Sequence, residues 1–354
     1  MKKYIIFSVF FLALVLAGCG DDNGTNGDDN GTEKIPRLVV DTMATAPTLS
    51  DANEAVWFTV DSVLVEIGGD PANYGQNISL QKQNAVMRAI KKSDTIYIWV
   101  RWHDPSGADL WANYIRKPDS SSSLWEHVTT EGQDMFFILF DNQDNGTEGA
   151  DCATMCHPGE GMKTTGGGMA DAWRWMSTCT MPGKMADDIW WDGATPSTDT
   201  ADATINKYVF RDNDDGNRPR YVHEDTMLYT GVFLYIEDTL KYNPLEPTRW
   251  PTGHRIPGFV TDSSIYGAPD RNDNSRNNVR AIAIFDSTGS STGWTWTVAF
   301  ARALNTGYND DVDLSTLDSV QVTVAATNDH PQETFGGPKP AHSGSKPFYI
   351  ILKP

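Results

Sequence analysis

Short runs that alternate apolar and polar residues limit this chain to a mainly β fold. The runs are rich in β-branched and aromatic side chains, and clusters of Pro, Gly, Asn and Asp separate them. Strands are predicted at residues 55–60, 95–102, 135–140, 228–236, 281–285, 294–300, 320–326 and 348–352. Runs of this length and spacing predict an immunoglobulin-like β-sandwich. The exception is the stretch 169–191, where we expect one or two short helices.

The first 18 residues have the pattern of a bacterial secretion signal. A basic start precedes an apolar run from Tyr4 to Leu16, and small residues follow it. This run is too short for a spanning helix, which needs about 20 apolar residues. Residues 16–19, Leu-Ala-Gly-Cys, resemble the lipobox of lipoproteins, in which the cysteine is lipidated. The alternative is an ordinary cleaved signal in which Cys19 is incidental.

The stretch after Cys19 is built almost entirely of Asp, Asn, Gly and Thr, with Asp-Asn-Gly-Thr occurring twice. Such a composition cannot bury a core, so it predicts a flexible spacer. We therefore expect a lipoprotein signal peptide at 1–18, a lipid anchor with an acidic linker at 19–35, and one β-sandwich domain at 36–354. The expected location is extracytoplasmic, with the lipid anchor at the outer membrane, the periplasmic face or the cell surface.

Charge and cysteine number narrow the function classes. The formal net charge of −19 argues against nucleic acid or anionic lipid as a partner and suits a basic redox partner. Lipidation of Cys19 leaves three cysteines, at 152, 156 and 179. An odd number does not fit a disulfide framework. All three are accounted for if Cys152 and Cys156 act as a pair and Cys179 is a spare, buried thiol.

The two neighbouring cysteines belong to the sequence Cys152-Ala-Thr-Met-Cys156-His157. Two thiols beside a histidine, in an exported protein, are the groups that attach and ligate a haem: the thiols form thioether bonds and the imidazole binds the iron. The usual motif has two residues between the cysteines, whereas this one has three. The alternative is a local disulfide, or two thiols beside a histidine by chance. The motif lies in a predicted long loop, 148–191, between strands.

Several segments in a fixed order resemble one family. They are residues 47–51 before Trp57, 96–105, 171–175, 186–188, 256–258, 296–304 and 342–347. Together they resemble the haem-binding domain of the ethylbenzene dehydrogenase gamma-subunit family, which is related to the dimethyl sulfide dehydrogenase gamma subunit. The resemblance runs from about Pro47 to the C-terminus.

The resemblance implies a sandwich that holds one haem at its loop end for electron transfer. Members with non-covalent haem b use a Met and a Lys as axial ligands, which correspond by position to Met162 and Lys346. This chain departs by supplying Cys152, Cys156 and His157, as the c-type branch does. The resemblance to the c-type branch therefore implies one covalent haem c per chain, or haem b if attachment fails.

The candidate axial ligands of the iron are not equally well supported. His157 is the expected proximal ligand, because attachment at Cys156 places its imidazole beside the iron. Met162 is the first choice for the opposite face, although five residues from His157 it could lie on the same side of the ring. The alternatives are Met176, Lys346, which must lose its proton to ligate, and His342.

Two tryptophans, Trp173 and Trp175, are candidates for the wall of a haem pocket, although aromatic density in a sandwich is usual for a core. The acidic runs 141–146 and 212–216 resemble calcium loops but lack the full spacing, so they are expected to be solvated turns. The sequence contains no nucleophile elbow, phosphate loop or zinc-protease helix.

The leading interpretation is a monohaem, lipid-anchored electron-transfer protein rather than a stand-alone enzyme. Its partner would be a redox protein, such as a molybdenum oxidoreductase or another cytochrome. One alternative is a surface β-sandwich that binds carbohydrate or another ligand without haem. A further alternative is a haem enzyme or small-ligand sensor, which requires an open axial position on the iron.

Overall fold

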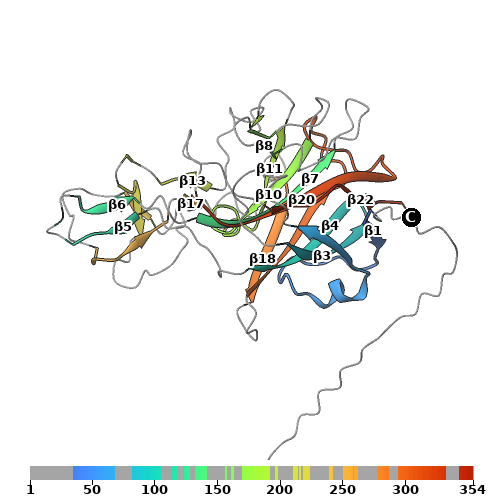
Figure 1. Ribbon diagram of the computed structural model, residues 1–354, viewed down its shortest axis with the longest axis horizontal. Coiled ribbons are helices and arrows are strands. Elements are labelled where there is room, and N and C mark those ends of the chain that lie inside the picture. Colours follow the sequence, from blue (N-terminus) through green and yellow to red (C-terminus); the bar gives the residue numbers. More distant parts are fainter. Residues whose placement is uncertain are drawn as a thin grey trace, which may run out of the picture. The chain divides into compact units, whose positions relative to one another are not determined.

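Thirteen of the described strands pair into one sheet that curls into two facing layers (Figure 1). The computed structural model describes residues 35–67, 82–104, 114–118, 121, 123–127, 132–141, 156–157, 161–162, 170–191, 196–197, 210–213, 215–216, 218–223, 239–241, 250–257, 259–261, 278–286, 294–331 and 343–353. The predicted signal 1–18, Cys19, the linker up to residue 34 and the predicted strand 228–236 lie outside the described residues.

The main sheet begins with β12 (Pro196–Ser197), β11 (Asp187–Trp191), β10 (Ala170–Met176), β7 (Gly132–Asp141), β20 (Ser319–Pro331) and β22 (Phe348–Ile351). It continues through β1 (Arg37–Thr42), β3 (Gln83–Lys92), β4 (Thr95–Asp104), β19 (Trp294–Ala303) and β18 (Arg280–Asp286). Two further strands join it, β2 (Val63–Ile67) beside β3 and β21 (Ser343–Gly344) beside β20.

Strand β1 connects the two layers. Its first half pairs with β22, with Leu38 opposite Ile350, and its second half pairs with β3, with Val40 opposite Ala89. Both pairings are parallel. On the other side of the curl, Met185 forms an isolated bridge with Arg280 at the start of β18. The backbone hydrogen bonds of both layers are therefore continued across the places where the sheet turns over.

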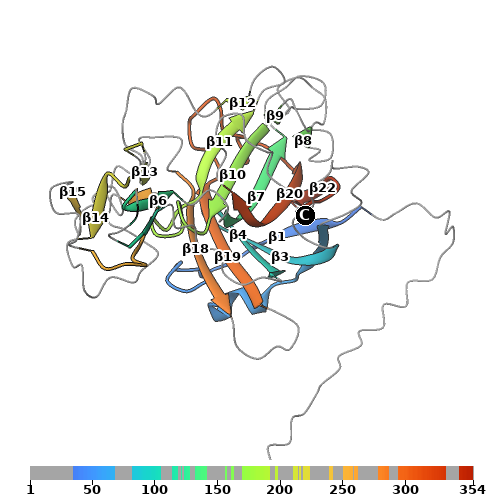
Figure 2. The same cartoon turned by 60° about the vertical axis from the view of Figure 1, so that its left-hand side comes forward.

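The main core lies between the layers, which Figure 2 shows from a second side. Side chains at alternate positions point into it because successive residues of a strand face opposite sides. From β4, β7 and β19 these are Ile96, Ile98, Val100, Trp102, Phe136, Ile138, Phe140, Trp296, Val298 and Phe300. The prediction of a mainly β sandwich is therefore confirmed.

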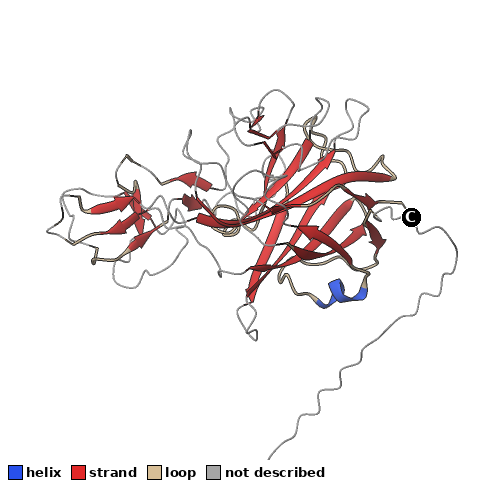
Figure 3. Cartoon of the chain, in the orientation of Figure 1, coloured by secondary structure: helices blue, strands red, loops and turns tan. Residues whose placement is uncertain are grey.

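The predicted strand 55–60 is wrong, because this segment forms the 3-10 helix η1 (Ala55–Thr59), drawn blue in Figure 3. Its Trp57 is fully buried against Leu49, Ile90 and Trp99, on the outer face of β3 and β4. A single turn presents Trp57 to this face, and Trp57 N–H donates to Glu54 O at 3.1 Å. Tertiary packing has overridden the β propensity of the run.

The short helices expected over 169–191 are also absent from the described residues: strands β10 and β11 occupy this stretch, joined by turns at 177–184. All seven residues of β10 pair with β7, from Ala170 opposite Asp141 to Met176 opposite Met135. On its other edge, β10 pairs with β11 from Ala170 to Arg174, and alternate residues of β10 reach the core. The predicted long loop 148–191 is correspondingly shorter.

Four smaller sheets complete the described strands. They are β13 (Phe210–Asp212) with β17 (Phe259–Thr261), β14 (Tyr221–His223) with β15 (Thr239–Lys241), β16 (Arg255–Ile256) with β5 (Tyr114–Arg116) and β6 (Trp125–His127), and β8 (Cys156–His157) with β9 (Gly161–Met162). Several share a second core made of Tyr114, Trp125, Val222, Trp250, Ile256 and Val260.

The helices among the described residues include none with the length and apolarity that crossing a bilayer requires.

Candidate functional site

The predicted haem-attachment segment forms a two-stranded antiparallel ladder from β8 and β9. Cys156 is opposite Met162, and His157 is opposite Gly161. Residues that face each other in such a ladder have Cα atoms about 4.5–5.5 Å apart. The fold therefore brings the backbone of Met162, the first-choice second ligand, beside that of Cys156. Cys152, the other predicted attachment residue, lies outside the described residues.

The alternative ligands are dispersed. Lys346 is exposed and lies between β21 and β22, whereas His342 is outside the described residues. Met176 is buried beside Met135 and Cys179. It is the last residue of β10, whereas the chain that comes from β9 enters β10 at its first residue, Ala170. Met176 lies six positions along the strand from Ala170, a path of roughly 20 Å.

The two tryptophans predicted to wall a haem are fully buried in the sandwich core. The ring centroid of Trp173 lies 4.7 Å from that of Phe140, and the ring of Trp175 lies 4.9 Å from that of Trp296. Their contact with haem stays a prediction. The predicted spare thiol, Cys179, is also buried, and its Sγ accepts a hydrogen bond from Gln133 Nε2 at 3.4 Å.

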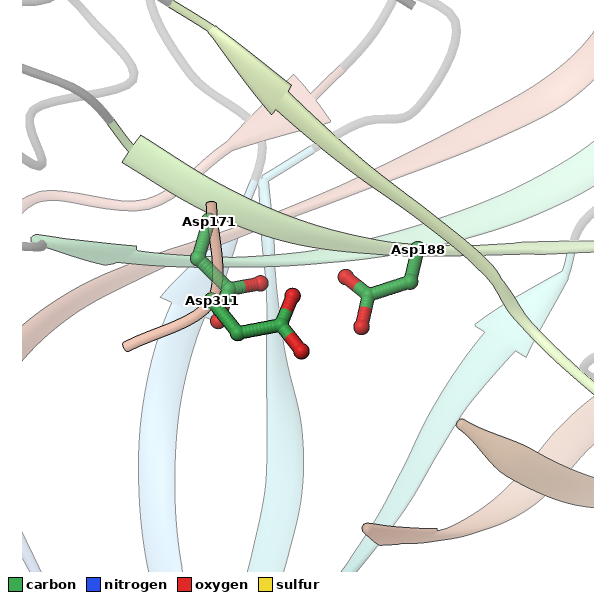
Figure 4. Close-up of side chains that lie close together, drawn as sticks. All are labelled: Asp171, Asp188 and Asp311. Atoms are coloured by element: carbon green, nitrogen blue, oxygen red, sulfur yellow. The ribbon is translucent and has the colours of Figure 1, made fainter. Parts of the chain in front are cut away.

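A buried acidic cluster next to Trp173 was not predicted. It consists of Asp171 on β10, Asp188 on β11 and Asp311 in the loop after β19, and Figure 4 shows their carboxyl groups turned toward one another. One carboxylate oxygen from each lies within 4.8 Å of the others. All three residues are at least nine-tenths buried.

Arg302 of β19 supplies the positive charge of this cluster. Its Nη1 lies 2.5 Å from Asp171 Oδ2, 3.4 Å from Asp188 Oδ2 and 3.7 Å from Asp311 Oδ1. Its Nη2 donates to Val312 O at 3.0 Å, and its guanidinium carbon lies 4.9 Å from the ring centroid of Trp173. Three carboxylates would suit a divalent cation. Here the guanidinium already lies against all three, so the arrangement is an ion-pair network of the core.

Burial dominates the acid–base behaviour of the cluster. It raises the pKa of Asp188 well above its usual range, and the charges of Asp171 and Asp311 raise it further. Burial and then Asp171 raise the pKa of Asp311 to about 7. Burial by itself would lower the pKa of Arg302, but the three surrounding carboxylates raise it instead, so Arg302 stays protonated.

A second polar contact in the core involves Trp296. Its indole Nε1–H points at two buried carboxylates, Asp104 Oδ2 at 3.1 Å and Asp134 Oδ2 at 2.9 Å. The ring also lies in an aromatic group, 6.4 Å from Trp102 and 4.9 Å from Trp175 between centroids. Trp296 thus joins β4, β7, β10 and β19 through one side chain.

The separated segments that carry the family resemblance meet at these two places. Segment 171–175 supplies Asp171, Trp173 and Trp175, segment 186–188 supplies Asp188, and segment 296–304 supplies Trp296 and Arg302. Their order along the chain is visible in the sequence, but their contact is not. Nothing in the sequence indicates that Asp311 is buried, because its acidic surroundings are typical of a solvated turn.

Comparison with known proteins agrees with the segment pattern. The ethylbenzene dehydrogenase family model matches residues 54–337. No curated protein is significantly similar to the chain.

Among solved structures, one neighbour is a protein of Bacteroides uniformis ATCC 8492 assumed to bind carbohydrate. It has 8% identity and a TM-score of 0.36, and the match covers 90% of this chain and 100% of that one. Another is a family 9 carbohydrate-binding module of Caldicellulosiruptor kristjanssonii in complex with glucose. It has 8% identity and a TM-score of 0.29, and the match covers 90% and 95% of the two chains. Likeness at this level carries no inference about a ligand. The family match, in contrast, spans most of the chain, which belongs to the ethylbenzene dehydrogenase family.

Proposed function

We propose that this protein is an extracytoplasmic electron carrier that binds one haem through the segment Cys152 to Met162. Cys152 and Cys156 attach the porphyrin and His157 binds the iron. The observation that carries the proposal is this thiol, thiol and imidazole set within a member of the ethylbenzene dehydrogenase family. The bound haem supplies one-electron transfer.

The β8–β9 ladder is consistent with this donor set. Because Cys156 is opposite Met162, a ring attached at Cys156 would have a thioether within one ladder position, and Met162 remains our choice for the second ligand. A thioether ligand favours a higher reduction potential than a second imidazole does. The role of the chain is to hold the haem, to exclude water from one face and to set its potential.

Anchoring and partner follow from other parts of the sequence. Lipidation at Cys19, with a flexible acidic spacer after it, would hold the sandwich near a membrane surface without a spanning helix. The net charge of −19 favours a partner with a basic docking surface. We propose a redox protein of this kind, such as a molybdenum oxidoreductase or another cytochrome.

The test is an absorption spectrum and an intact mass of the protein made with cytochrome c maturation machinery. We expect a c-type spectrum and the mass of one haem that survives denaturation. Replacing both Cys152 and Cys156 by Ala should lose the covalent haem, and the matched control Cys179→Ala should retain it, because Cys179 lies outside the motif. A haem that is lost on denaturation would indicate haem b instead, and protein without haem would contradict the proposal.

A second candidate function is a surface module that binds carbohydrate without haem, and one observation favours it. Trp294 on β19 is 37% exposed, and its ring lies edge-on to Phe285 at 5.9 Å between centroids. Exposed indole rings stack on sugar rings because both present flat apolar faces. The other tryptophans whose side chains are described are buried: Trp57, Trp99, Trp102, Trp125, Trp173, Trp175, Trp250 and Trp296.

This candidate predicts that Trp294→Ala weakens binding of soluble oligosaccharides at least about tenfold, the loss expected for one stacked ring. Titration calorimetry with cello-, xylo- and manno-oligosaccharides measures it. Phe58→Ala is the matched control, because Phe58 is an exposed aromatic residue on η1. Absence of binding by the unmodified protein would reject the candidate.

A further inference from the structure

The cluster of Asp171, Asp188, Asp311 and Arg302 contains more negative than positive charge. One guanidinium faces three carboxylates, and all four side chains are at least nine-tenths buried. A fully ionised cluster would therefore leave two uncompensated charges in the core. Burying an unpaired charge is costly enough that a carboxylate there takes up a proton instead.

The hydrogen bonds of Asp171 show which contact between carboxylates lacks a hydrogen. Asp171 Oδ2 accepts from Arg302 Nη1 at 2.5 Å and from Val312 N–H at 3.0 Å. Asp171 Oδ1 is buried and has no partner among the described residues. A carboxylate oxygen of Asp188 lies within 4.8 Å of one of Asp171, yet two ionised carboxylates have no hydrogen to place between them. A proton on Asp188 would supply the donor that this contact requires.

Asp311 belongs to a different part of the structure, the loop 305–313, which closes where Leu314 N–H donates to Leu304 O at 2.8 Å. Asp311 Oδ2 accepts from Asn278 Nδ2 at 2.7 Å, and Asn278 Oδ1 is buried without a partner among the described residues. The same loop places Val312 in the core. Asp311 therefore attaches the loop to the charged cluster.

We propose that Asp188 holds a proton at neutral pH, which it donates toward Asp171, and that Asp311 binds a second proton on acidification, which tightens the loop 305–313 on the sheet. The cluster is thus a proton-binding site built into the sandwich core. Each proton removes one uncompensated charge beneath the loop.

The charged groups that face this site come from four places. They are Asp171 on β10, Asp188 on β11, Arg302 on β19, and Asp311 with its neighbour Asp310 in the loop. The pair Arg174–Asp187, at 2.6 Å, belongs to the other face of β10 and β11, because these residues alternate with Trp173 and Asp188.

The direction of the pH dependence follows from the raised pKa values. In the unfolded chain an aspartate releases its proton at about pH 4. In the folded chain burial raises the pKa of Asp311 to about 7 and raises the pKa of Asp188 well above its usual range. The folded state therefore binds more protons between these values. The contribution of the cluster to stability is therefore largest in acid and falls as the pH rises from about 4 to about 7.

The first experiment is infrared spectroscopy of the full mature protein in heavy water across the neutral range. We expect a protonated-carboxyl band that persists at about pH 7, far above the usual pKa of an aspartate. Asp188→Asn should reduce this band to the part that disappears near neutral pH as Asp311 loses its proton, while its amide N–H keeps a donor beside Asp171. The exposed Asp215→Asn is the matched control and should leave the band intact. Absence of the band in the unmodified protein at about pH 6 would overturn the proton on Asp188, whether or not any variant folds.

The second experiment measures the urea midpoint and the amide exchange of Val312 against pH. We expect the midpoint to fall and the exchange protection to weaken from about pH 5 to about pH 8. In Asp311→Asn the part of this change that occurs near neutral pH should disappear. The same pH dependence in Asp311→Asn as in the unmodified protein would contradict the role of Asp311.

Discussion

Replacing Arg302 by Met is expected to destabilise the protein by about 3–5 kcal/mol, the range for breaking a buried ion pair from one side. The variant keeps an unbranched side chain beside Trp173 but leaves Asp171, Asp188 and Asp311 without the cation that contacts all of them. Typical domains have only about 5–15 kcal/mol of unfolding free energy, so the loss is a large fraction. Urea unfolding near neutral pH measures it.

The control for this prediction is Arg218→Met. Arg218 contacts Asp215 at 2.9 Å, but both side chains are exposed, and such pairs contribute about 0–1 kcal/mol. Acid should reduce the loss in Arg302→Met, because protonated carboxyl groups no longer require a counter-charge. A loss as small as that of Arg218→Met would contradict the assignment of Arg302 as the charge that holds the cluster together.

Replacing Trp296 by Ala is expected to cost about 3–5 kcal/mol, the usual range for removing a large buried aromatic side chain. The indole contacts Trp102 and Trp175 and donates to Asp104 and Asp134. Trp296→Phe separates the two contributions, because it keeps a ring but removes the N–H. It should cost about 1–3 kcal/mol, the penalty for leaving a buried acceptor without its donor. Thermal and urea unfolding measure both variants.

Trp294 provides the comparison on the same strand, two residues before Trp296. It is 37% exposed at the end of β19, so Trp294→Ala should cost about 1 kcal/mol or less. If Trp296→Phe were as stable as the unmodified protein, the indole N–H would have no energetic role between Asp104 and Asp134.

Six strands of the main sheet, β4, β7, β18, β19, β20 and β22, could be predicted from the sequence because their side chains alternate with a period of two. The neighbouring strands β1, β2, β3, β10 and β11 were not predicted. The predicted run 95–102 lies within β4, and 135–140 lies within β7. In both strands alternate side chains enter the main core. A local pattern is sufficient where one face of a strand is buried against the opposite layer.

The same local reasoning gave wrong results where a distant partner decides the conformation. Residues 55–60 alternate like a strand, yet Trp57 packs on the outer face of β3 and β4 from a 3-10 turn. Residues 169–191 were expected to hold one or two short helices, yet β7 pairs with β10 along its whole length. Neither partner is near these segments in the sequence, so no window of local residues contains the deciding contact.

Of the two candidate sites, one is visible in the sequence and the other only in the tertiary structure. The sequence by itself determined the proposed attachment chemistry, because Cys152, Cys156 and His157 lie within six residues and their side chains define the reaction they can undergo. It also revealed the ordered segments that identify the family. Only the tertiary structure decided that Asp171, Asp188, Asp311 and Arg302 face one another, since they come from β10, β11, β19 and a loop. The sequence does not show whether a charged residue is buried. The four side chains form a proton-binding site because they are buried.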